Sequence, residues 1–320
     1  MRLAYRTLLL TLTAMLFSSP ASAIFIESTE RYAITYYLVG LLPEQADADG
    51  RAYSGPATAE TVSARVTARL DQLSVPLVPA APGYASAALG STGHSSVMAA
   101  GYMTGSGIYR QQLLASAVEQ VTAVIPSLGY HDVLYSFDLY SMFFEFWDDY
   151  GLMGNLEKII ARLRYTVELY QDATLARSQV FQAEAKAFSD SGNIVFDIST
   201  APLLSSWEVY GESDDNFLGI RFDPVSVTDL NLGTVLWTTG DHATFTVRTA
   251  MWVELSFPEG ILDVGGAAGI SDPNGITIDP TAHIRLQTVD TPPAVPETGS
   301  GLLAALGLAA VLARRRRRLP

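Results

Sequence analysis

The sequence predicts an all-β protein, an antiparallel β-sandwich of jelly-roll type, with an export signal before it and one short apolar helix after it. Three observations support this fold class. Short segments alternate apolar and polar residues, turns rich in Gly, Asp, Asn and Pro separate them, and no strand–helix–strand rhythm is present. Of the 320 residues, 48% are hydrophobic, so the chain between the two end segments can bury a sizeable core.

The first 23 residues have the three parts of a secretory signal peptide. Arg2 and Arg6 form a small basic region, residues 8–17 are apolar, and Ala21 and Ala23 form an A-x-A cleavage site. We therefore expect residues 1–23 to be removed and the mature domain to span residues 24–290.

The first third of the domain gives mixed signals. Residues 32–39 are β-branched and aromatic, residues 45–50 suggest a turn, and residues 61–70 alternate like a half-buried strand. Residues 74–107 are rich in Pro, Ala, Gly and Ser and predict a long, flexible surface excursion. Residues 110–125 fit both a helix and a strand, and their β-branched end before Pro126 favours the strand.

The remaining segments predict strands more plainly. Residues 132–147 are the most aromatic part of the chain and predict one or two buried central strands. Residues 160–170 and 181–187 alternate, and Arg162 and Arg164 lie on the polar side of the first of these segments. The segments at 194–198, 217–222 and 234–238 are short strands between turns. Residues 244–257 show the clearest alternation, with Trp252 on the polar side, and residues 283–289 close the domain.

Charge and composition exclude several functions. The net charge of −13 includes seven arginines in the two end segments, without which the chain carries −20. Such an acidic protein is a poor partner for nucleic acid, because phosphate binding depends on Lys and Arg. The chain has no cysteine, which excludes a lipoprotein anchor, disulfides and thiolate metal sites.

Sequence motifs for catalysis or metal binding are weak. The segment Gly93-His94-Ser95-Ser96-Val97 begins like a G-x-S-x-G nucleophile elbow, but Val97 replaces its last glycine. The four histidines are scattered singly, without the H-E-x-x-H spacing of a metal site: His94, His131, His242 and His283. We therefore predict no catalytic residue, no cofactor and no transition metal.

Acidic clusters leave a structural Ca²⁺ as an open alternative. Residues 47–50 resemble the middle of a calcium loop, but Gln45 and Pro56 would hold its first and last ligand positions and neither fits. Further acidic turns lie at residues 148–149, 214–216 and 272–275. Glu145 with Asp148 or Asp149 offers a carboxylate pair of the kind that glycosidases use.

Aromatic residues outside the core suggest carbohydrate binding. Trp252 lies on the polar side of its predicted strand, and Trp207 and Trp237 flank turns. Sugar rings stack on such side chains, although sheets also bury many aromatic residues.

Residues 291–320 carry a three-part signal. Val295, Pro296, Glu297 and Thr298 follow a proline-rich linker, residues 301–313 are apolar, and five arginines end the tail: Arg314, Arg315, Arg316, Arg317 and Arg318. The apolar helix would be about 20 Å long, short of the ~30 Å hydrocarbon core. The arginines keep their end cytoplasmic, which places everything before Val295 outside the membrane.

This tail resembles the PEP-CTERM sorting signal, which exosortases recognise and process in Gram-negative bacteria. That family usually has Val-Pro-Glu-Pro, and here Thr298 stands in place of the second proline. With Gly299 the stretch is also similar to the sortase motif Leu-Pro-x-Thr-Gly. The resemblance covers the tail alone and implies an exosortase-type processing enzyme as a partner and transient anchoring in the inner membrane.

We therefore expect an exported, non-enzymatic, β-rich protein with a structural or interaction role. Its expected location is the cell surface or the exopolysaccharide matrix. The alternative is a secreted carbohydrate-binding or polysaccharide-degrading protein.

Overall fold

The structure is a computed structural model that describes residues 24–39, 42–57, 60–68, 83–90, 95–103, 111–148, 159–190, 193–200, 204, 206–211, 217–240, 242–257, 264–272, 276 and 279–289. The chain divides into two units, Met1–Thr288 and Val289–Pro320. Only Val289 of the second unit is described, so the architecture is that of the first unit.

The described residues are almost entirely β-strand. The strands are β1 (Phe25–Val39), β2 (Leu42–Ser54), β3 (Val62–Ala68), β4 (Gly83–Leu89), β5 (Ser95–Met103), β6 (Gln111–Val124), β7 (Gly129–Asp148), β8 (Ile159–Gln171), β9 (Thr174–Asp190), β10 (Asn193–Thr200), β11 (Trp207–Tyr210), β12 (Phe217–Phe222), β13 (Val225–Trp237), β14 (Thr244–Phe257), β15 (Val264–Asp272) and β16 (Ile284–Val289). One helical turn, α2 (Pro280–His283), precedes β16.

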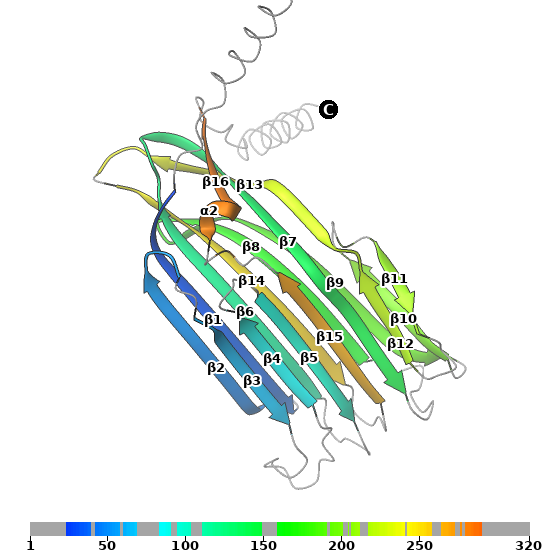
Figure 1. Cartoon of the computed structure of the whole chain (residues 1–320). Helices are drawn as coiled ribbons and strands as arrows, with labels where there is room; N and C mark the ends of the chain where they lie inside the picture. Colours follow the sequence, from blue (N-terminus) through cyan, green and yellow to red (C-terminus); the bar gives the residue numbers. More distant parts are fainter. Residues whose placement is uncertain are drawn as a thin grey trace, which may run out of the picture. The chain divides into compact units, whose positions relative to one another are not determined.

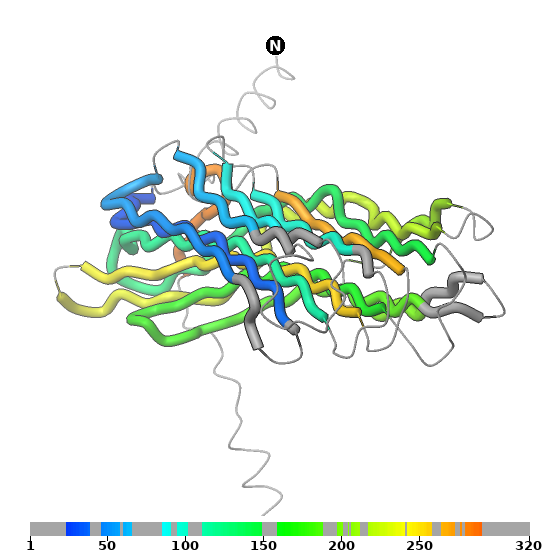
Figure 2. The backbone as a smooth tube through the Cα atoms, turned by 90° about the horizontal axis from the view of Figure 1, so that it is seen from below, coloured from blue at the N-terminus to red at the C-terminus, as the bar shows by residue number. Residues whose placement is uncertain are grey.

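The strands form two antiparallel sheets that pack face to face as a β-sandwich (Figures 1 and 2). Within the described residues, the seven-stranded sheet has the order β10-β9-β8-β14-β6-β1-β2. The nine-stranded sheet has the order β11-β12-β7-β15-β5-β4-β3, with β13 and β16 also paired to β7. The predicted all-β, antiparallel sandwich is confirmed.

The period-two patterns predicted which side chains form the core. In β8 the buried residues alternate with more exposed ones from Ile159 to Leu169, and β14 does the same from Phe245 to Met251. Strand β6 alternates along its whole length, so the strand interpretation of residues 110–125 is confirmed over the helical one. Side chains from the two inner faces fill the space between the sheets.

The aromatic segment forms β7, which lies within the nine-stranded sheet and changes partners along its length. Its second half pairs with β12 and β15, and β13 pairs with Gly129–Leu139 of its first half. Ser141 has a φ of 50°, and the alternation of buried side chains breaks at this residue. The prediction of a buried central strand is confirmed, with an irregularity where the partners change.

The predicted excursion over residues 74–107 is wrong for two stretches inside it. Gly83–Leu89 and Ser95–Met103 are strands β4 and β5, paired with each other between β3 and β15. Their small residues fit a close approach of the two sheets: a Cβ on Gly101 would lie 2.8 Å from a methyl carbon of Leu113. Ala85, Ala87 and Ala99 are buried there. Small side chains mark tight packing here, not a mobile loop.

The predicted turn at residues 45–50 is also wrong, because these residues lie inside β2. Gly50 pairs with Tyr32 of β1, and a Cβ on Gly50 would lie 2.7 Å from the Tyr32 ring. The glycine therefore makes room for an aromatic ring from the neighbouring strand.

None of the helices that the structure describes is long and apolar enough to cross a membrane. Residues 1–23 and 291–320, with the predicted signal peptide and the predicted helix at 301–313, lie outside the described residues.

Candidate functional site

The predicted sorting and cleavage residues are not described by the structure. These are Ala21, Ala23, Val295, Pro296, Glu297, Thr298, Arg314, Arg315, Arg316, Arg317 and Arg318. Their roles stay predictions.

Ser95, the residue considered as a nucleophile, begins strand β5 and is buried. A nucleophile elbow requires a strand before the serine and a helix after it, and here a strand follows. Gly93 and His94 lie outside the described residues.

The described histidines contact different residues. His131 is buried, with Nε2 2.9 Å from the carbonyl oxygen of Ser127, and Nδ1 of His283 lies 2.9 Å from the carbonyl oxygen of Ser136. His242 is exposed. Among the described residues, no group of three or more His, Asp or Glu side chains is placed to hold a metal ion.

The acidic residues singled out in the sequence have structural contacts instead. Glu145 lies on the outward side of β7, while Asp148 is buried on the inward side. The two carboxylates therefore point to opposite faces of the strand and do not flank one glycosidic bond. Asp47 and Asp49 accept hydrogen bonds from the backbone N–H groups of Arg65 and Ser63 on β3, at 2.8 and 3.3 Å. Asp149, residues 214–216 and residues 273–275 are not described.

The three tryptophans considered for sugar binding have different surroundings. Trp237 packs against the hydrophobic core, and Trp207 is 39% exposed on the edge strand β11, beside Phe222. Trp252 lies half-buried on the outward face of β14, next to a surface hollow. Trp252 is therefore the tryptophan whose setting fits a binding site.

The hollow has a volume of about 190 Å³ and lies over β8, β9 and β14, with β10 at its rim. This volume suits a single sugar ring better than a drug-sized ligand. Its lining residues are Arg162, Leu163, Arg164, Gln182, Ala183, Glu184, Ser199 and Trp252.

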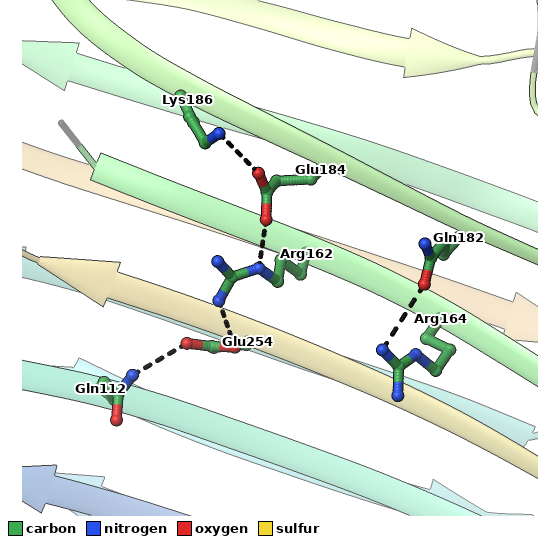
Figure 3. Close-up of polar contacts among 7 residues, drawn as sticks. All are labelled: Gln112, Arg162, Arg164, Gln182, Glu184, Lys186 and Glu254. Atoms are coloured by element: carbon green, nitrogen blue, oxygen red, sulfur yellow. Dashed lines mark hydrogen bonds and ion pairs between the residues drawn. The ribbon is translucent and has the colours of Figure 1, made fainter. Parts of the chain in front are cut away.

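A chain of charged side chains crosses the face beside the hollow (Figure 3). Lys186 Nζ lies 2.9 Å from Glu184, Glu184 pairs with Arg162, and Arg162 Nη1 lies 2.9 Å from Glu254. Glu254 also accepts a hydrogen bond of 2.9 Å from Gln112. We call this set from Lys186 to Gln112 the charged row. It connects β9, β8, β14 and β6, and it holds the hollow's polar wall in one arrangement.

Ion pairing in the charged row shifts the pKa values of its members. Partial burial acts to raise the pKa of Glu184, but hydrogen bonds from Lys186 and Arg162 outweigh it, and the pKa is lowered. Burial likewise acts to lower the pKa of Arg162, and its bonds to Glu184 and Glu254 raise it. Both groups therefore stay ionised at neutral pH.

Arg164 differs from the charged row. Its guanidinium carbon lies 5.5 Å from the centroid of the Trp252 ring, and Nη2 donates a long hydrogen bond of 3.5 Å to Gln182. The side chain is exposed, and within the described part of the chain no carboxylate pairs with it. It is an exposed cation over an aromatic ring.

Aromatic side chains continue on the same face toward β1. Tyr32 and Tyr36 point outward there and are 38% and 39% exposed. Strand β6 separates β1 from β14, and Tyr36 is in register with Glu254, two residues along β14 from Trp252. The two residues therefore lie roughly 12 Å apart on this face. The face can thus contact more than one ring of an extended ligand.

The alternation predicted that Arg162 and Arg164 point outward, but it did not predict their function. Arg162 faces Glu184 of β9 and Glu254 of β14, and Arg164 faces Gln182 and Trp252, across registers that join distant segments. No local sequence pattern predicts these cross-strand neighbours.

Comparisons with known proteins assign no family. No family model matches the chain, and no curated protein matches it. A solved structure of infectious bursal disease virus strain Gx has 11% identity, covers 94% of this chain and 75% of its own, and has a TM-score of 0.13. The VP2 subviral particle of that virus has 12% identity, coverage of 93% and 75%, and a TM-score of 0.11. Likeness at this level carries no argument about this chain.

Proposed function

We propose that this protein is exported to the cell surface or extracellular matrix and binds polysaccharide there without cleaving it. One observation carries the proposal: the half-buried Trp252 ring lies beside a hollow of about 190 Å³ lined by Arg, Gln, Glu and Ser side chains. Sugar sites combine an aromatic platform with fixed polar groups in this way. The exposed rings of Tyr32 and Tyr36 extend the platform for a polymer.

The acidic groups at the hollow suit binding better than hydrolysis. A glycosidase needs one carboxyl group whose raised pKa keeps it protonated as a general acid. The pKa of Glu184 is instead lowered by its bonds to Lys186 and Arg162. Its carboxylate can accept hydrogen bonds from sugar hydroxyls but is a poor proton donor.

The export pathway is part of the same proposal. The signal peptide at residues 1–23, the sorting tail at residues 291–320, an exosortase-type processing enzyme and the jelly-roll arrangement rest on the sequence patterns. A polysaccharide-binding face is consistent with delivery to an exopolysaccharide matrix, where such a face would hold the protein in place.

Binding to polysaccharide tests the proposal directly. We expect the purified protein to bind the exopolysaccharide of its host saturably, and Trp252→Ala to weaken binding about tenfold or more. Trp207→Ala is the matched control, because it removes an exposed tryptophan from the other sheet. Isothermal titration calorimetry measures both. Equal affinity of wild type and Trp252→Ala would refute the site.

The export part has its own test. Mass spectrometry of the C-terminal peptide from the native host should find the chain ending near Glu297, without Arg314 to Arg318. An end at Thr298 would assign processing to a sortase, and an intact end at Pro320 would refute the sorting hypothesis.

A further inference from the structure

The cationic side chains on the outward face around Trp252 pair with carboxylates, except at one residue. Strands β8, β9 and β14 present four cationic side chains there: Arg162, Arg164, Lys186 and Arg248. Arg162 and Lys186 pair within the charged row, and Arg248 Nη1 lies 2.7 Å from Glu168. Among the described residues, Arg164 is the one of these four without a carboxylate partner.

The acidity of the protein bears on this unmatched arginine. Apart from the seven arginines at the two ends, the chain has 13 Lys and Arg residues and a balance of −20. An exposed arginine in such a protein has many carboxylates available, yet Arg164 lies over an indole ring instead. Its ring contact leaves the edge of the guanidinium, which carries the N–H donors, open toward a ligand.

Resting on the proposed function, we propose that the polysaccharide is acidic and that Arg164 binds the carboxylate of a uronic acid residue whose ring contacts Trp252. A guanidinium matches a carboxylate with two parallel N–H···O bonds, and such charge-assisted bonds are stronger than neutral ones. The hollow next to Trp252 accommodates the ring, and the exposed edge of Arg164 faces the ring's substituent.

The surrounding charges permit an anionic ligand. Lys186, Glu184, Arg162 and Glu254 sum to zero, as do Arg248 and Glu168. The exposed Asp197 of β10, which pairs in register with Lys186, is balanced by Arg164, so these groups carry no net negative charge although the protein is acidic. Arg164 places its positive charge beside the hollow. The long 3.5 Å contact with Gln182 is weak enough for a carboxylate to replace it.

Two oligosaccharides that differ only in charge test the proposal on the full-length protein. The first is a galacturonic acid oligomer, and the second is the same oligomer with its carboxyl groups reduced to neutral hydroxymethyl groups. We expect the acidic oligomer to bind about tenfold tighter or more in calorimetry. The difference should shrink at high ionic strength, because salt screens an exposed pair.

Substitutions locate the effect. Arg164→Gln should abolish the preference for the acidic oligomer, whereas Arg164→Lys should keep part of it through the charge. Arg221→Gln is the matched control: Arg221 is also an exposed arginine over an aromatic ring, 5.1 Å from the Tyr210 centroid, but on β12 of the other sheet. Urea unfolding checks that each variant is folded.

The outcomes separate the two proposals. Equal binding of both oligomers by wild type would overturn the acidic-glycan inference and leave polysaccharide binding intact. A preference for the acidic oligomer that survives Arg164→Gln would show that Arg164 does not bind the carboxylate. Binding of an acidic peptide but of neither oligomer, or affinity unchanged by Trp252→Ala, would overturn the proposed function itself.

Discussion

Arg31 is a charged residue buried within the core. Its side chain is fully buried, with Nε 3.5 Å from Glu119, which is also buried on the neighbouring strand β6. Its Nη1 and Nη2 donate to the carbonyl oxygens of Glu60 and Gly90, at 2.7 and 3.0 Å. Those residues flank strands β3 and β4 of the other sheet, so Arg31 joins the two sheets through one guanidinium.

Removing this guanidinium should be costly. We expect Arg31→Met to reduce the free energy of unfolding by about 3–5 kcal/mol, because the carboxylate of Glu119 would stay buried without its cation. Arg285→Met is the control, since its 2.7 Å pair with Asp229 is exposed and should contribute less than about 1 kcal/mol.

Urea unfolding of both variants, and of Arg31→Met with Glu119→Gln, measures the difference. The double variant should recover part of the loss, because the neutral amide removes the buried charge and can still accept the backbone N–H of Ile276. Equal losses for Arg31→Met and Arg285→Met would contradict this account.

At the scale of elements, the edge strands β2 and β3 are joined through side chains. Each is the last strand of its sheet, and edge strands present unpaired N–H groups that invite aggregation. Asp47 of β2 accepts the N–H of Arg65 on β3 at 2.8 Å. Asp47 and Asp49, which resemble part of a calcium loop in the sequence, therefore bind backbone N–H groups at the open edge of β3.

Asp47→Ala should reduce the free energy of unfolding by about 1 kcal/mol, the usual net value of one hydrogen bond, and should increase aggregation. Asp47→Asn keeps an acceptor oxygen and should be nearly neutral. Asp197→Ala on β10 removes another exposed carboxylate from a different edge strand and controls for charge. Urea unfolding and light scattering test this, and identical behaviour of Asp47→Ala and Asp197→Ala would disprove it.

At the scale of the whole molecule, two tyrosines bridge the sheets through the core. Tyr135 of β7 and Tyr165 of β8 are buried, and their hydroxyl oxygens lie 3.0 Å apart. Burial raises the pKa of both well above 10.0, the nearby Asp272 carboxylate raises the pKa of Tyr135 further, and Tyr135 that of Tyr165. Above about pH 10, the folded protein therefore keeps two phenol protons that the unfolded chain loses.

This difference makes stability depend on alkaline pH. Because the folded pKa values exceed the unfolded ones, the contribution is complete below about pH 10 and is lost as the pH rises through and above that value. We expect Tyr135→Phe with Tyr165→Phe to flatten the alkaline fall in stability and to cost about 1 kcal/mol at neutral pH. Tyr140→Phe, which alters an exposed tyrosine, is the control.

Urea unfolding across the alkaline range, with tyrosinate absorbance, measures the effect. If both buried tyrosines ionised near pH 10 while the protein stayed folded, the prediction would fail.

Periodicity was the reliable part of the sequence. Because successive side chains in a strand point to opposite faces, the alternation at residues 160–170 and 244–257 indicated which residues are buried and that Trp252, Arg162 and Arg164 point outward. Amino-acid type alone gave wrong predictions at segments rich in small residues. Gly50 and Gly101 suggested a turn and a loop, although each makes room for a side chain of another strand.

The sequence by itself therefore determined the all-β class and the outward direction of the side chains at the proposed site, since both follow from a two-residue period within single strands. Only the tertiary structure decided which strands became neighbours. Strands β8, β9 and β14 bring Arg164 beside Trp252 and line the hollow, through contacts between distant positions such as Arg162 and Glu254, which are 92 positions apart. Such contacts depend on cross-strand register, which a local pattern does not encode.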